Sequence, residues 1–245
     1  MAYRELTPPA ELRSHVACLW AKTGPGGRVL PDGCADIVWT GRELIVAGPA
    51  TRAVHPATSS EATKLGVRFR VGAAGAALGL PASELLDSSP RLADVWREGA
   101  ELADRVADAG TPGAGLRLLV DAVARRLGDA APADPLVRGA VLAVARPDAR
   151  VAPLAPDIGL GERQLRRRFD AAVGYAPKTL AGVLRLQRFL RLAGARDASL
   201  ARLAADAGYA DQPHLGRECR RLTGLPPRAL LSAGAGPAGE RLSSA

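Results

Sequence analysis

The sequence is poor in several residue types, and each shortage excludes a class of protein. It contains three cysteines, one methionine and 4% aromatic residues. The cysteines are odd in number and far apart, which argues against a disulfide framework. No apolar run approaches the roughly 20 residues of a membrane-spanning helix, and the first residues, MAYRE, lack the apolar core of a signal peptide. We therefore expect a cytoplasmic protein without a membrane partner.

Charge is distributed unevenly along the 245 residues. Residues 1–134 contain 15 Lys and Arg against 16 Asp and Glu, a net charge of −1, whereas residues 135–245 contain 18 against 9, a net charge of +9. A near-neutral half joined to a basic half indicates that only the second half meets a polyanion. A nucleic acid, a ribosome or an anionic membrane surface would each explain this asymmetry.

The first half combines strand patterns with helix patterns. Apolar stretches bounded by Gly, Pro or Asp predict strands at residues 15–22, 35–40, 43–47 and 64–71. Spacing near 3.6 residues predicts helices at residues 82–86, 92–107 and 115–127. The apolar stripe of the last helix fits either burial in its own domain or a homodimer seam. The expected fold class is α+β: a small β-barrel or curled sheet with helices, followed by an all-α C-terminal domain.

The basic half contains an internal repeat. Five positions recur 50 residues later, namely Leu165, Phe169, Gly174, Pro177 and Leu180 as Leu215, Cys219, Gly224, Pro227 and Leu230. Three upstream positions recur 49 residues later, namely Leu154, Asp157 and Gly159 as Leu203, Asp206 and Gly208. Each unit therefore runs from a short apolar helix through a glycine turn to a basic helix, a glycine stop and a proline that begins the next helix.

Two copies of this pattern are typical of two helix-turn-helix units. In each unit the second helix is expected to bury residues at i and i+4 and to leave polar side chains on its other faces. Arginine pairs with guanine, and glutamine with adenine, through two hydrogen bonds in the major groove. The helix between the units, residues 177–193, has a length of about 25 Å. It would hold two such helices about one turn of DNA, roughly 34 Å, apart.

At these positions the sequence resembles the DNA-binding domain of the AraC/XylS family. One motif is R-x-L-x-R-x-F-x4-G-x2-P, from Arg163 to Pro177. The other is A-x3-G-Y-x2-Q-x-H-L-x-R-x6-G-x2-P, from Ala204 to Pro227. The resemblance covers about residues 136–231 and implies a bacterial-type activator or repressor of transcription. It implies a seven-helix domain that places two recognition helices in adjacent major grooves.

The resemblance also implies which residues meet DNA. They are Arg163, Arg166 and Arg167 in the first unit, and Gln212, Pro213, Gly216 and Arg217 in the second. Pro213 and Gly216 offer no side-chain hydrogen bond, so the second helix is expected to use shape or phosphate contacts. Cys219 stands where the family usually has Phe, which should loosen the second unit's core. We expect sequence reading to rely more on the first unit.

Two other interpretations of the basic half are open from composition alone. A structural DNA-binding protein would show little sequence preference and a steep salt dependence. A helical bundle with a solvated arginine face would bind no DNA. Two repeats in register, together with a non-basic domain in front of them, favour the transcription regulator.

The resemblance, together with a stretch around residues 128–135 that contains Gly and two prolines and a Gly-, Ala- and Ser-rich end, suggests four segments. We expect a sensing or dimerisation domain at residues 1–128, a linker at 129–135, a double helix-turn-helix domain at 136–232 and a disordered tail at 233–245. Residues 31–39, PDGCADIVW, together with residues 46–51 and 66–72, resemble an uncharacterised N-terminal domain found on some AraC-type regulators. The partners implied are double-stranded DNA, RNA polymerase, a small-molecule effector that signals through the N-terminal domain, and a second copy of the chain.

The first domain offers candidate ligand residues. They are Trp20, Asp32, Cys34, Asp36, Trp39 and Arg68, with Phe69 as a further aromatic wall. The alternative is that the aromatic residues only fill the core.

Cys34 permits a different kind of regulator. It would sense oxidants or alkylate itself if a neighbouring cation lowered its thiol pKa, whereas a buried structural thiol would do neither. The residues His15, Cys18, Cys34 and His55 lack the spacing of a zinc site, so we expect no metal and no cofactor. Because the sequence contains no nucleophile, phosphate-binding or zinc-protease motif, we expect no enzymatic activity.

Overall fold

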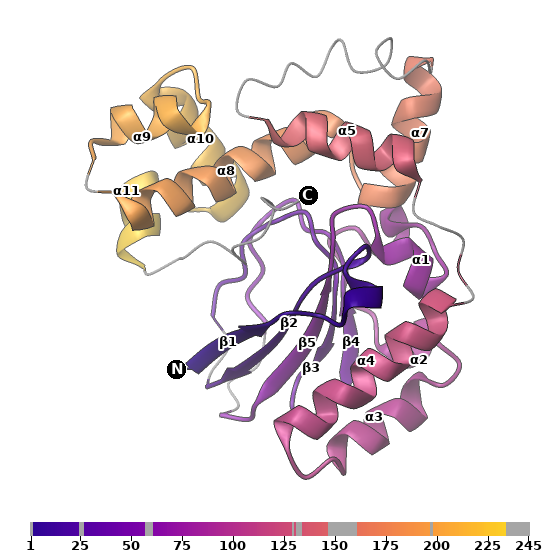
Figure 1. Cartoon of the computed structure of the whole chain (residues 1–245). Coiled ribbons are helices and arrows are strands. Elements are labelled where there is room, and N and C mark those ends of the chain that lie inside the picture. The colour runs from indigo at the N-terminus through magenta and orange to yellow at the C-terminus, as the bar shows by residue number, and fades with distance from the viewer. Residues whose placement is uncertain are drawn as a thin grey trace.

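A computed structural model shows an N-terminal α+β part and a C-terminal helical part that pack against each other (Figure 1). The structure describes residues 2–24, 27–56, 61–128, 130, 134–146, 161–196 and 198–233. Among these residues, no helix combines the length and the apolar character that a membrane crossing needs.

The N-terminal part is built on an open antiparallel sheet of five strands. Its strands are β1 (Ala2–Leu6), β2 (Val16–Thr23), β3 (Asp36–Trp39), β4 (Leu44–Ala47) and β5 (Lys64–Phe69). They lie in the order β1-β2-β5-β3-β4, with β1 and β4 at the edges. The two edge strands do not pair, so of the two expected forms, a small β-barrel or a curled sheet, the structure has the sheet, and the α+β fold class is confirmed.

The helices of this part pack beside the sheet (Figure 1). They are α1 (Ala74–Leu78), α2 (Leu92–Val95), α3 (Gly99–Ala107) and α4 (Pro112–Gly128), with 3-10 turns η1 (Ala10–Leu12) and η2 (Ala82–Leu85). The prediction of one helix over residues 92–107 is wrong. The chain is extended at Trp96, whose buried ring belongs to the core, and α3 starts three residues later.

The apolar stripe of α4 faces the core of its own domain. Leu116, Leu119 and Val123 are buried together with residues of β3 and β5. The Thr111 hydroxyl accepts a hydrogen bond from the Ala114 N–H at the start of the helix, which satisfies one free donor there. These buried residues are not available as a homodimer seam.

The C-terminal part is helical throughout its described residues. Its helices are α5 (Pro135–Ala145), α7 (Glu162–Val173), α8 (Pro177–Ala195), α9 (Leu200–Ala207), α10 (Gln212–Thr223) and α11 (Pro227–Ser232). The helix α8 has 19 residues and a length of about 28 Å. The expected supporting helix of the first unit, with Leu154 and Gly159, lies outside the described residues. So do most of the expected linker and all of the expected tail after Ala233.

Candidate nucleic-acid interface

The helix α7 has one buried face and one exposed face. Leu165, Phe169 and Val173, which follow one another at intervals of four residues, are buried in the helical core. Arg163, Arg166 and Arg167 are exposed. Gly174 ends the helix in the left-handed conformation, at φ +94°, which suits a residue without a Cβ atom. Three neighbouring guanidinium groups are thereby presented on one short, well-terminated helix.

The helix α10 repeats this arrangement. Leu215, Cys219 and Leu222 are fully buried, and Gly224 ends the helix at φ +75°. At its start the Asp211 carboxylate accepts a hydrogen bond of 2.6 Å from the His214 N–H. Cys219 therefore fills the same place as Phe169 in the first unit.

The predicted DNA contacts of α10 differ in exposure. Gln212, Pro213 and Arg217 are exposed, whereas Gly216 is buried. The Arg220 guanidinium lies over Gly216 and donates a hydrogen bond of 3.5 Å to its carbonyl oxygen. A side chain from the next turn thus covers the position that has none of its own.

The structure gathers the predicted residues of each unit around a shallow groove. The groove on the second unit has a volume of about 600 Å³ and is lined by Leu200, Gln212, Pro213, Gly216, Arg217, Arg220, Pro226, Pro227 and Arg228. All four predicted residues of this unit are among them. Arg228 is an addition that the sequence reasoning missed, because it lies in α11, beyond the repeated pattern of the recognition helix.

The groove on the first unit has a volume of about 640 Å³. It is lined by Pro81, Ser83, Arg163, Gln164, Arg166, Arg167, Asp170 and Ala171. The Asp170 carboxylate lies 3.7 Å from the Arg166 guanidinium, one helical turn away. Pro81 and Ser83 come from the N-terminal part, so this groove is shared between the two parts of the protein.

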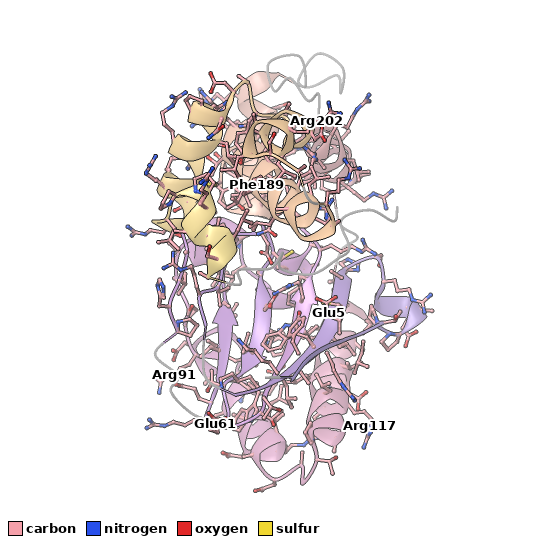
Figure 2. All side chains as sticks on the ribbon, turned by 90° about the vertical axis from the view of Figure 1, so that its left-hand side faces the viewer. Glu5, Glu61, Arg91, Arg117, Phe189 and Arg202 are labelled. Carbon is pink, nitrogen blue, oxygen red and sulfur yellow. The ribbon has the colours of Figure 1, made fainter. Side chains whose placement is uncertain are left out.

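The helix α8 joins the two units through the core. Leu180, Val183, Leu186, Phe189 and Leu190 are buried along it. Figure 2 shows Phe189 inside the helical part, with Arg202 near its outer surface. Continuous burial along one helix makes α8 a stiff connection between the recognition helices.

Five of the six candidate ligand residues of the N-terminal part lie together. The Asp36 carboxylate accepts hydrogen bonds of 3.0 Å from Trp20 Nε1 and from both Nε and Nη2 of Arg68. Asp32 Oδ2 lies 3.6 Å from Arg68 Nη1. Asp32 Oδ1 accepts a hydrogen bond of 2.9 Å from the Cys34 N–H. We call these five residues the Arg68 cluster.

Trp39 is separate from the Arg68 cluster. It lies in the buried apolar core of the sheet, as does Phe69, which is fully buried. For these two rings, the interpretation as core residues agrees with the structure.

Burial and opposite charge determine the electrostatics of the Arg68 cluster. Burial alone would lower the pKa of Arg68, but Asp36 and Asp32 hold it well above its ordinary value. Burial raises the pKa of Asp32, and the nearby Asp36 adds to this while Arg68 opposes it. The cluster therefore holds a permanently charged guanidinium that is bonded to acidic groups.

The same surroundings disfavour chemistry at Cys34. Burial raises the pKa of its thiol well above the ordinary value, and the neighbouring Asp32 raises it further. A thiol acts as a nucleophile only as the thiolate, so this environment opposes both self-alkylation and oxidant sensing. Burial also raises the pKa of Cys18 and of Cys219 to about 12. Among the described residues, no His, Cys, Asp or Glu cluster is placed to hold a metal ion.

Comparison with known families assigns the helical part. Residues 154–233 match a family described as "Helix-turn-helix domain". The C-terminal part of this chain is an AraC-type helix-turn-helix domain. With this domain, the chain is a DNA-binding transcription regulator. Residues 4–91 match a family described as a domain of unknown function, DUF6597.

Solved structures give a weaker similarity. ToxT from Vibrio cholerae O395 is 10% identical, with 89% of this chain and 97% of that chain covered at a TM-score of 0.45. A second structure of ToxT from Vibrio cholerae is 8% identical, with 95% and 99% covered at a TM-score of 0.45. A search of curated protein sequences finds no match.

Proposed function

We propose that this AraC-type regulator inserts α7 and α10 into two adjacent major grooves of one DNA site. The observation that supports this is a pair of basic, glycine-terminated helices that both pack against the buried helix α8. The net charge of +9 on residues 135–245 supplies attraction to phosphates.

The two helices would make different kinds of contact. Arg163 and Arg167 in α7 are exposed and have no acidic partner among the described residues, so they are available to guanine edges. In α10 the central position is Gly216, covered by Arg220, and the surrounding groove adds Arg217 and Arg228. We propose that α7 carries most of the base reading and that the second unit holds the DNA backbone.

A signal received by the N-terminal part would reach DNA through the contacts between the two parts. Gly174 of the first unit lies against Pro49, and the Leu222 carbonyl oxygen of the second unit accepts a hydrogen bond from the Ala53 N–H. Contacts with both units support the proposal that the N-terminal part controls binding. Binding to RNA polymerase, to a small-molecule effector and to a second copy of the chain stays a prediction.

A selection from random DNA with the full chain tests the proposed function. The expected result is one motif with two blocks of preferred bases, about ten base pairs apart, and with the stronger preference in one block. Binding to this motif should be at least a thousandfold tighter than to random duplex, roughly the lower end for specific regulators. If no motif is enriched and binding only collapses as salt rises, the protein is a structural DNA binder and the proposal is wrong.

A further inference from the structure

The N-terminal part reaches the end of the second recognition helix with a short paired segment. Val29 and Val54 form an antiparallel bridge with two backbone hydrogen bonds of 2.9 Å. We call residues 28–29 and 53–54 the finger. The Ala53 N–H donates a hydrogen bond of 2.7 Å to the carbonyl oxygen of Leu222, and the Arg28 guanidinium donates one to the carbonyl oxygen of Thr223.

The accepting carbonyl groups are those that a helix cannot satisfy by itself. Leu222 and Thr223 form the last turn of α10, where carbonyl oxygens have no partner further along the helix. A positive guanidinium at a helix C-terminus is also favourable, because the helix dipole is negative there. The finger therefore caps α10 and attaches it to the N-terminal part.

The first recognition helix is attached at the equivalent place. A methyl group on Gly174 would lie 2.9 Å from Pro49 Cγ and 3.1 Å from the carbonyl oxygen of Ala82. A methyl group on Gly72 would lie 3.5 Å from Val173, in the last turn of α7. The C-terminal ends of both recognition helices thus touch the N-terminal part.

The connecting helix α8 also contacts the N-terminal part. Gln187 Nε2 donates a buried hydrogen bond of 2.6 Å to the carbonyl oxygen of Pro31. Gly33 is in close contact with Leu180, since a methyl group there would lie 2.9 Å from the leucine side chain. Residues 28–33 therefore contact α8 and α10 in one continuous stretch.

These contacts determine what controls the relative position of the two units. The main packing partners of α7 are α5, α8 and η2, and those of α10 are α8, α9 and α11. Within the described residues, α8 and the N-terminal part are thus the main structures that touch both recognition helices. We infer that the N-terminal part is a brace that fixes the distance and angle between α7 and α10, with Arg28 and Ala53 as positioning residues.

The brace can be tested without DNA, by the distance between spin labels on α7 and α10. Labels would be attached through Gln164→Cys and Arg217→Cys, both at exposed positions, in a chain that also carries Cys34→Ser. We expect one narrow distance distribution in this background. Arg28→Ala combined with Ala53→Pro removes both donors of the finger and should broaden the distribution at least about twofold.

A matched control is available on the neighbouring residue. Arg52 is exposed and lies next to Ala53 in the sequence. Arg52→Ala removes one positive charge, as Arg28→Ala does, and should leave the distance distribution unchanged. Arg28→Ala alone removes one donor and keeps the backbone unchanged, so it should broaden the distance distribution less than the double variant. It can be measured even if the variant with Ala53→Pro does not fold. A distribution that stays equally narrow in both finger variants would overturn the inference.

The consequence for DNA rests on the proposed function and uses the unlabelled chain. Wild type should bind its selected site about tenfold more tightly than the same site with one base pair inserted between the blocks. Arg28→Ala should reduce this ratio to about threefold, while Arg52→Ala keeps it. If wild type selects no two-block site, the proposed function fails, and the label distances still decide whether the brace exists. If the ratio is the same in wild type and Arg28→Ala, the brace does not set the spacing.

Discussion

A methyl group on Gly174 would lie 2.9 Å from the Cγ atom of Pro49, so the end of the first recognition helix is in direct contact with the N-terminal part. Gly224 is its counterpart in the second unit, also left-handed, but a methyl group there would have no neighbour within 4 Å. A side chain at Gly224 would therefore cause backbone strain alone. A side chain at Gly174 would cause the same strain and would also clash with the N-terminal part.

This pair leads to a prediction about stability. Gly224→Ala should lower the free energy of unfolding by about 1–2 kcal/mol, because alanine is strained in the left-handed conformation. Gly174→Ala adds a clash with Pro49 and should lower it by about 2–4 kcal/mol. Urea unfolding of both variants measures the difference. Equal losses would show that the contact with Pro49 is easily relieved.

The exposed arginines of α7 carry a prediction about specificity. Arg163→Ala and Arg167→Ala should each weaken binding to the selected site by about 1–3 kcal/mol and relax the preference for one base. Arg117→Ala is the control, since this residue is exposed at the far end of the N-terminal part (Figure 2). The measurement is equilibrium binding to the selected site and to its single-base variants. An unchanged base preference would remove that arginine from the reading surface.

Arg228 should act on phosphate and not on bases. Arg228→Ala is expected to weaken binding to every sequence by a similar factor and to reduce the slope of log K against log salt by about 1. Titrations of the selected site and of random duplex at several salt concentrations give both quantities. A loss confined to the selected site would mean that Arg228 contacts a base.

The raised thiol pKa of Cys34 predicts slow alkylation in the folded protein. At pH 8 little thiolate is present, so iodoacetamide should modify Cys34 at least about tenfold more slowly than after unfolding in urea. Mass spectrometry of the digested chain separates this cysteine from Cys18 and Cys219. Rapid modification of Cys34 in the native protein would contradict this prediction and would support the hypothesis that Cys34 is a reactive, regulatory thiol.

The raised pKa of Asp32 predicts a pH dependence of stability. The folded state binds the proton of the Asp32 carboxyl group more tightly than the unfolded state, in which the pKa of this group is near 3.8. The contribution of Asp32 is therefore complete below that pH and is lost as the pH rises through the raised, folded-state value. Asp32→Asn lacks this loss, so its unfolding free energy relative to wild type should increase as the pH rises from about 4. Urea unfolding between pH 4 and pH 8 measures this, and a relative stability that falls with pH would contradict it.

The sequence predicted the two recognition helices α7 and α10 well because their signals are local. Glycines that end α7 and α10, and buried residues four positions apart, lie within a few residues of each other. The resemblance placed Gly216 on the DNA-facing side, but it could not show that Arg220 covers it. That cover depends on the rotamer of a long side chain in the next turn.

Two features of the N-terminal part had no clear signal. The strand β1 is a short edge strand with exposed Tyr3 and Leu6, so it lacks the alternation of a half-buried strand. The break between α2 and α3 occurs at Trp96, where burial of a large ring overrides a helical pattern that continues on both sides.

The contacts between the two parts could not be predicted at all. Ala53 and Leu222 are joined through backbone atoms, which any residue other than proline could supply. All five residues of the Arg68 cluster were among the candidate ligand residues, but the sequence could not show how they are bonded to one another. This bonding depends on the pairing of β5 with β2 and β3.

The finger also has a consequence for the order of events during synthesis. Arg28 and the carbonyl oxygen that it caps are 195 residues apart in the chain. At about 5–20 residues per second, a ribosome needs roughly 10–40 seconds to add the residues between them. The N-terminal sheet has that time to form before α10 exists, so the second recognition helix emerges onto a surface that is already folded. A nascent chain stalled before Leu222 would present the finger without the helix that it is built to hold.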